Sequence, residues 1–155
     1  MGIAITLAQY LVNGGIEYDL VPHPHSETAS ASAAASQVPA DSVAKAIVLK
    51  GRDGFMLAVL PASRHIQFDE LQRLLGEVGM ANEEQIETLF IDCEPGSVPA
   101  LGAAYGLDVL VDDSLAQQSE IYFEGGDHAN LVHVSGTSFR KLMTDSKRGR
   151  FTGRA

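Results

Sequence analysis

Lys45 is the first residue whose chemistry needs an explanation, because it interrupts an apolar segment. Residues 43–49 are otherwise apolar, and a second apolar run, 55–61, follows after the turn residues 51–54. Two such runs joined by a glycine-containing turn predict a β-hairpin. Burying an unpaired ammonium group in such a strand is costly. From this segment alone two interpretations stay open: strand alternation turns Lys45 to solvent, or its side chain meets a ligand.

A loop rich in glycine and proline is the second segment that could do chemistry. Residues 93–102 contain two glycines, two prolines and little charge. The backbone N–H groups of a rigid loop of this kind can bind an ester or carboxylate oxygen. Most loops of this composition only connect elements, so the pattern by itself assigns no function.

Histidines occur in two further loops. His23 and His25 follow a predicted strand, and His128 ends the tight turn 125–128. Two histidines two residues apart can share a metal ion, but no third ligand is evident nearby, so we expect no metal and favour loop polarity or substrate contact. His128 is either catalytic or a residue at a hairpin tip. Cys93, the single cysteine, has no evident base to activate it.

The size and composition limit the fold and the partners. The 155 residues, 45% of them hydrophobic, are expected to form one domain over 1–155. No apolar run approaches the roughly 20 residues needed to span a bilayer, and no signal sequence is evident. We therefore expect a cytoplasmic protein without a membrane partner. A net charge of -9 argues against DNA as a partner and against sequence-independent binding to nucleic acid.

The positive charge is concentrated at the C-terminus. Six of the 11 lysines and arginines fall in the last 16 residues. Residues 144–155 are expected to form a flexible basic tail, which either contacts a phosphate backbone or is simply solvated.

Hydrophobic periodicity and turn residues predict the elements that position these segments. Their order mixes helices and strands irregularly, which favours an α+β or mixed-sheet domain over a regular βαβ winding. Nucleotide binding through a glycine-rich fingerprint or a P-loop is not indicated, because neither motif is present. The expected helices are 3–13, 28–37, 63–76, 83–90 and 135–143, and the expected strands are 16–21, 41–50, 55–61, 107–111, 121–124 and 131–134.

Taken together and in order, several of these segments resemble the YbaK and prolyl-tRNA synthetase-associated editing domains. The matching motifs lie at 43–49 with 56–61, at 96–102, at 111–115 and at 121–128 with 132–134. The resemblance implies an α+β fold with a mixed, mostly antiparallel, barrel-like sheet flanked by helices. It also implies a domain that works in trans, without a cofactor, and hydrolyses the ester at the 3′ acceptor end of a mischarged aminoacyl-tRNA.

The resemblance also implies a set of site residues. The family's lysine falls on Lys45 and its glycine-rich loop on 96–102, so the expected catalytic residues are Lys45, Gly96 and Gly102. Lys45 would hold the ester or the terminal phosphate of the substrate, and the loop would bind the carbonyl or the aminoacyl group. No Ser-His-Asp set is apparent, so we expect a water nucleophile, assisted by a ribose hydroxyl. The expected substrate-binding residues are His25, Ser97, Val98, Pro99, Ala100, Leu101 and His128.

Ala100 marks a departure from the family pattern. The loop of the family has a proline at this position, whereas here Pro99 comes one residue earlier. The amino-acid preference of the loop therefore stays open. Two other functions also stay open: a non-catalytic module that recognises an aminoacyl-tRNA end or a protein partner, and a hydrolase of a different small ester or thioester.

Overall fold

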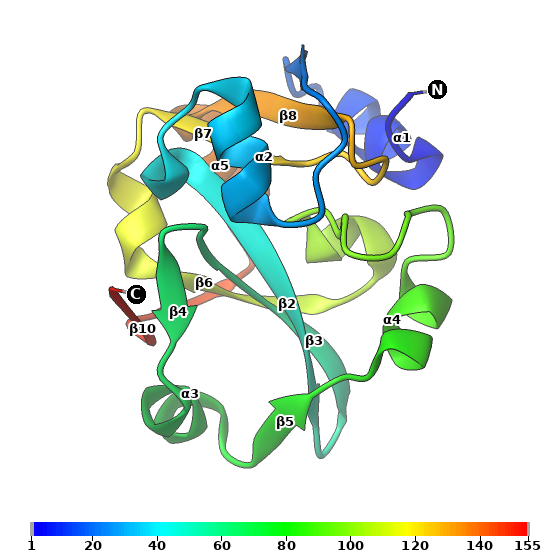
Figure 1. The fold of residues 1–155 in the computed structure, drawn as a ribbon. Coiled ribbons are helices and arrows are strands. Elements are labelled where there is room, and N and C mark those ends of the chain that lie inside the picture. The colour runs from blue at the N-terminus through cyan, green and yellow to red at the C-terminus, as the bar shows by residue number, and fades with distance from the viewer. Residues whose placement is uncertain (1, 155) are drawn as a thin grey trace.

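The chain folds around one long β-hairpin that crosses the middle of the molecule (Figure 1). The computed structural model describes residues 2–154. The helices are α1 (Ile5–Asn13), α2 (Ala29–Ser36), α3 (Phe68–Leu75), α4 (Glu83–Leu89) and α5 (Gly136–Leu142), with 3-10 turns η1 (Ala40–Ser42), η2 (Gly102–Tyr105) and η3 (Asp113–Gln117). The strands are β1 (Asp19–Pro22), β2 (Val43–Gly51), β3 (Gly54–Pro61), β4 (Arg64–Ile66), β5 (Val78–Met80), β6 (Asp108–Asp112), β7 (Glu120–Glu124), β8 (Asn130–Ser135), β9 (Lys147–Gly149) and β10 (Thr152–Arg154).

The main sheet is mixed and mostly antiparallel. Its strand order is β1-β8-β7-β2-β3-β6-β9, with β5 pairing the end of β2 on the same edge that β7 pairs at its start, while β4 and β10 form a separate ribbon. β2/β7, β3/β6 and β6/β9 are parallel, and the remaining pairs are antiparallel. The predicted α+β fold with a mixed, mostly antiparallel sheet is thus confirmed. Within residues 2–154, the path runs from β1 to β9 without closing into a continuous barrel.

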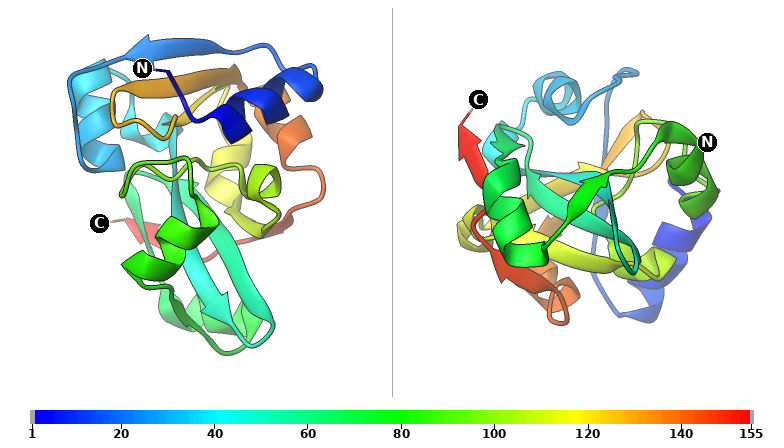
Figure 2. Two further views of the ribbon diagram at one scale, coloured as in Figure 1. Left: turned by 90° about the vertical axis from the view of Figure 1, so that its right-hand side faces the viewer. Right: turned by 90° about the horizontal axis from the view of Figure 1, so that it is seen from below.

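The helices lie around the outside of this sheet (Figure 2). α1 packs through Leu7 and Leu11, which are four residues apart and therefore lie on one helix face. These leucines join a core built from β3, β6, β7 and β8, with Leu57 and Phe123 among its fully buried members. None of the helices in residues 2–154 is long and apolar enough to cross a membrane.

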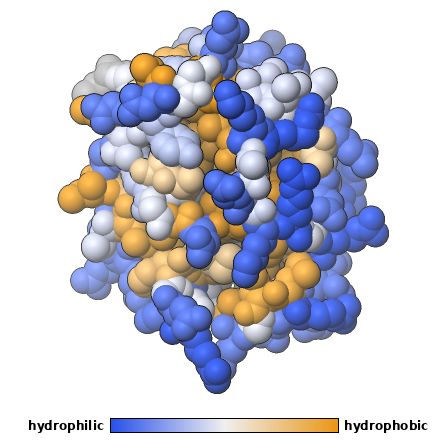
Figure 3. Space-filling view, turned by 180° about the vertical axis from the view of Figure 1, so that it is seen from behind, coloured by the Kyte–Doolittle hydropathy of each residue, from blue (hydrophilic) through white to orange (hydrophobic). Residues whose placement is uncertain are grey.

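The exposed apolar side chains are spread over several elements. Seen from behind, the surface shows apolar areas interrupted by hydrophilic side chains (Figure 3). Scattered apolar residues are ordinary on a protein surface. The large ones are Ile5, Val12, Leu20, Phe68, Leu74, Met80 and Ile91.

The C-terminal segment up to residue 154 contains two strands, whereas the sequence predicted a flexible tail over 144–155. Residues 147–149 pair with β6 and residues 152–154 pair with β4. Between these strands Phe151 is fully buried in a second core cluster. The backbone N–H of Phe151 donates to the buried carboxylate of Asp112 at 3.1 Å. One apolar side chain therefore anchors a segment whose other residues are mainly basic or small.

Short strands account for most of the other differences from the predicted elements. The helix expected over 63–76 begins at Phe68, because residues 64–66 form β4 with β10 as partner. Residues 78–80 form β5, which the sequence pattern does not indicate. Three-residue strands are too short to show a period, so only their partners define them.

His133 on β8 connects three strands near the edge of the main sheet that β1 forms. Its Nδ1 lies 2.8 Å from the Asp19 carboxylate of β1, and its Nε2 lies 2.7 Å from the Glu120 carboxylate of β7. Partial burial lowers the pKa of His133, but the two carboxylates outweigh that effect and raise the pKa above its usual value. A raised folded-state pKa stabilises the fold fully below the unfolded pKa of about 6.5, and this contribution is lost as the pH rises through the folded pKa.

We therefore expect His133→Gln to flatten the decline in the free energy of unfolding above about pH 6.5. Urea denaturation of both proteins at a series of pH values measures this. His65→Gln is the matched control, because His65 is exposed on β4. If the free energy of unfolding of His133→Gln depends on pH as it does in the wild type, the two carboxylates do not raise the pKa of His133.

Candidate functional site

The candidate site opens where β2 has no strand neighbour on one edge. β2 pairs with β7 at residues 43–44 and with β5 at residues 49–51, so within the described chain residues 45–48 lack a strand partner on that side. The carbonyl of Val48 accepts a hydrogen bond of 3.0 Å there from the segment after β5. Backbone groups alternate in direction along an antiparallel strand, so the N–H and C=O of Ala46 face the same gap.

A cavity of about 310 Å³ occupies this gap. Its walls come from β2, the start of α2, β5, α4, the loop after α4 and the end of β7. Two charged side chains, Lys45 and Glu124, line an otherwise mostly apolar wall. The apolar lining is provided mainly by Ile47, Val48, Met80, Ile86 and Val98.

Lys45 is a half-buried cation that has no counter-ion among residues 2–154. It lies opposite Leu60 in the hairpin and lines the cavity. Burial disfavours the charged form and lowers the pKa of Lys45. In residues 2–154 no carboxylate lies within 4 Å of its amine. This position favours the interpretation in which Lys45 meets a ligand over the one in which strand alternation simply exposes it.

Gly96 and Val98 bring the glycine-rich loop to the same cavity. Gly96 has a φ of +83°, and a Cβ atom there would lie 3.3 Å from the ring of His128, so this position favours glycine. The N–H of Ser97 donates to the Glu94 carbonyl at 3.1 Å and closes a turn. Gly96 and Val98 are thus the loop residues that line the cavity, and the oxygen-binding role of the loop stays a prediction.

The second half of this loop belongs to the core and not to the cavity lining. Pro99, Ala100 and Leu101 are buried. Gly102 begins η2, where a Cβ atom would lie 2.6 Å from the Val109 side chain, so close packing requires glycine there. The departure from the family pattern at Ala100 thus falls on a core position. The structure does not bring Ala100, Leu101 or Gly102 to the cavity wall that Lys45 lines.

Glu124 is a site residue that the sequence analysis did not select. It ends β7, is only 5% exposed and lines the cavity. The hydroxyl of Ser32 on α2 donates to its Oε1 at 2.5 Å, and that of Ser97 donates to its Oε2 at 3.1 Å. Burial raises the pKa of Glu124, although both hydroxyls favour the charged form. An acidic residue at the end of a buried strand and before two glycines was the available signal.

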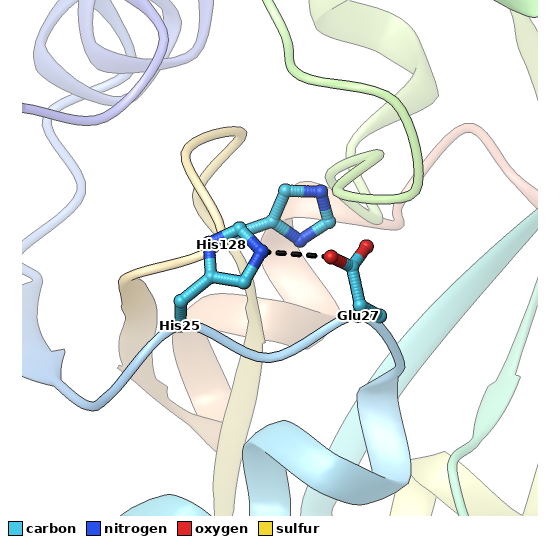
Figure 4. A group of neighbouring side chains, drawn as sticks. All are labelled: His25, Glu27 and His128. Atoms are coloured by element: carbon cyan, nitrogen blue, oxygen red, sulfur yellow. Dashed lines mark hydrogen bonds and ion pairs between the residues drawn. The ribbon is translucent and has the colours of Figure 1, made fainter.

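His25, Glu27 and His128 form a group beside the cavity (Figure 4). His25 Nε2 lies 2.8 Å from the Glu27 carboxylate, and this hydrogen bond is the main cause that lowers the pKa of Glu27. The centroids of the two imidazole rings are 4.9 Å apart. The buried His128 ring has its Nδ1 2.8 Å from the Ser26 carbonyl and its Nε2 beside the Pro95 carbonyl.

These three residues could hold a metal ion, whereas no third ligand beside His23 and His25 was evident in the sequence. The expectation of no metal stays a prediction. Their ligand atoms lie within 4.8 Å of one another, and imidazole and carboxylate are ligands that suit zinc. His128 would first have to exchange one of its two carbonyl contacts for the metal. His23, the other candidate from sequence, is not in this group. It is buried, and its Nδ1 lies 2.7 Å from the Pro24 carbonyl.

Cys93 lies outside the cavity lining, and its thiol is not activated as a nucleophile. Its Sγ lies 3.3 Å from the Tyr105 hydroxyl, and burial raises the pKa of the thiol to about 11. A nucleophilic cysteine needs a lowered pKa, so the thiol is unsuited to covalent catalysis.

The mixed sheet and the helices around it form the α+β fold of the YbaK-like editing domains. The model of the family described as the aminoacyl-tRNA editing domain matches residues 23–142. The chain therefore belongs to the aminoacyl-tRNA editing domain family, as the sequence motifs predicted.

Three individual proteins are similar to this chain in sequence or in fold. A segment of 65 residues, 41% of the chain, is 37% identical to the proline–tRNA ligase of Thermosipho africanus (strain TCF52B), and the match spans only 12% of that protein. A solved structure described as a candidate trans-editing enzyme for prolyl tRNA synthetase superposes with a TM-score of 0.81 at 20% identity, covering 96% of this chain and 95% of the other. A protein from Marinobacter aquaeolei VT8, described as a candidate signal transduction protein, matches with a TM-score of 0.79 at 15% identity, covering 96% of this chain and 30% of that one. At these identities the solved structures show a shared fold.

Proposed function

We propose that this protein hydrolyses the ester bond of a mischarged aminoacyl-tRNA, acting in trans. The observation that carries the proposal is that Lys45 and the loop residues Gly96 and Val98 line one cavity. Membership of the aminoacyl-tRNA editing family supports an editing role. The similar fold described as a trans-editing enzyme supports action on a tRNA that another protein has charged.

The proposed reaction uses water as the nucleophile. The water oxygen attacks the ester carbonyl, and the resulting oxyanion is stabilised by backbone N–H groups around Gly96. The bond between the carbonyl carbon and the ribose oxygen then breaks, the amino acid leaves as a carboxylic acid, and a proton from the water ends on the ribose hydroxyl. Lys45 holds the substrate as a compact cation, either at the ester or at the terminal phosphate. The step needs no cofactor and no covalent enzyme intermediate.

A panel of mischarged tRNAs tests the proposal directly. We expect the wild-type protein to release the amino acid from at least one of them faster than the uncatalysed reaction. Release from none would refute the deacylase, and retained tRNA binding would then support a non-catalytic recognition module. Turnover of model esters that excess tRNA does not inhibit would instead support a hydrolase of other esters.

A further inference from the structure

Glu124 is a buried carboxylate whose surroundings do not neutralise it. Among the described residues no lysine, arginine or histidine nitrogen lies within 4 Å of its oxygens. His23 and His128 are close enough to favour its charged form, but the nitrogens of His128 contact carbonyl oxygens instead. Buried carboxylates are ordinarily paired with a cation. Glu124 is therefore a buried carboxylic group without an ion-pair partner among the described residues.

The carboxylate is also held in a fixed position with acceptor capacity left over. The hydroxyls of Ser32 and Ser97 each donate to a different oxygen of Glu124. A carboxylate can accept about four hydrogen bonds, so roughly half of this capacity stays free. Ser32 is in turn bonded to Ser26 at 2.8 Å, so a chain of buried hydroxyls supports the first contact. Glu124 is thus oriented before any ligand arrives.

The cavity presents two opposite charges that do not pair with each other. Lys45 and Glu124 both line it, yet their charged atoms are more than 4 Å apart. Apolar side chains such as Ile47 and Val98 also line the cavity. A matching ligand carries a positive charge, an electron-rich oxygen and an apolar group.

We propose that Glu124 binds the α-ammonium group of the aminoacyl ester, an inference that rests on the proposed function. The ammonium is bonded to the carbon next to the ester carbonyl, so one small ligand meets Glu124 through its amine and Lys45 or the Gly96 loop through its oxygens. The substrate class is then an aminoacyl-tRNA with a free α-amine and an apolar side chain. Esters that lack the charge at the α-position are poor substrates.

The alternative role for Glu124 is purely structural, because its serine contacts tie α2 and the loop to β7. The two roles differ in what they require of the substrate. A structural tie affects all substrates equally, whereas an ammonium receptor discriminates by the charge at the α-carbon. Replacing the α-amine by a hydroxyl removes this charge with almost no change in size. Nitrous acid converts a charged tRNA into its α-hydroxyacyl counterpart, which supplies the matched probe.

The experiment measures kcat/KM for an aminoacyl-tRNA that the wild type cleaves and for its α-hydroxyacyl counterpart, each corrected for uncatalysed hydrolysis. We expect wild type to prefer the amine by roughly 10- to 100-fold, the range of one charge-assisted hydrogen bond. Glu124→Gln should lower kcat/KM for the amine by a similar factor and leave the hydroxy substrate nearly unchanged. Glu94→Gln makes the same change at an exposed carboxylate near the loop and should keep the wild-type preference.

Equal cleavage of both esters by wild type overturns the ammonium contact while leaving the deacylase proposal intact. An equal loss on both substrates in a folded Glu124→Gln protein, checked by its melting temperature, assigns Glu124 to structure and also overturns the contact. Because the wild-type comparison needs no variant, a Glu124→Gln protein that fails to fold does not prevent a decision. Cleavage of neither ester from the whole panel refutes the proposed function itself.

Discussion

Lys45→Ala is expected to lower the deacylation rate by about 100-fold or more, the scale on which removal of one stabilising group acts in a site that excludes water. The loss is large because Lys45 and the carboxylate Glu124 are the charged side chains that line the cavity, and of these two only Lys45 can hold an anionic or electron-rich oxygen. Folding should be little affected, since the amine has no ion pair among the described residues. Deacylation of the tRNA panel, with the melting temperature as a check, measures both.

Two further variants separate charge from packing. Lys45→Met keeps the length of the apolar stem and removes only the charge, so it should lose as much activity as Lys45→Ala. Lys50→Ala is the matched control, because Lys50 is exposed in the same strand and its amine lies 5.9 Å from the Phe55 ring, away from the cavity lining. Full activity in Lys45→Met would show that the ammonium group has no role in the reaction.

Phe151→Ala is expected to lower the free energy of unfolding by about 3–5 kcal/mol. The side chain is fully buried against Leu71 and Leu110 in the second core cluster, and it holds the strands β9 and β10 on either side. Truncation leaves a cavity and loosens both strand pairs. For a chain of this size the melting temperature should fall by roughly 10 °C.

Phe68→Ala makes the same chemical change at a side chain that is 40% exposed and should cost much less. Thermal and urea unfolding of the three proteins decide the comparison. If Phe151→Ala melts like the wild type, the C-terminal segment does not contribute to the stable fold, and the expectation of a flexible tail would be restored.

The elements that sequence predicted well are those with a clear local signal. The hairpin follows from two apolar runs around a glycine turn, and α1 follows from Leu7 and Leu11 with glycines after the helix end. β5, β9 and β10 have three residues each and are held by distant partners, so their own residues carry no period. Phe151 was one apolar residue in a basic segment, and only its burial shows that the segment is folded.

The candidate site also contains residues that the sequence indicated and residues that only the fold brought together. Lys45 and the glycine loop stand out because a cation in an apolar strand and a cluster of glycine and proline are unusual locally. Glu27 was two residues from His25 but gained significance only when folding brought His128 beside it. The loop residues Ala100 and Gly102 share a motif with Gly96, yet they pack into the core.

The sequence by itself determined the family, the central hairpin and the lysine in its first strand, because these depend on residue types at short spacing. The tertiary structure alone decided which groups share the cavity. Strand β2 loses its neighbour over residues 45–48, and that gap is created by where β5 and β7 end. Glu124 reaches the gap from the end of β7 and meets serines from two other segments. Contacts between residues that are far apart in the chain follow from the packing of whole elements, and no local sequence pattern predicts that packing.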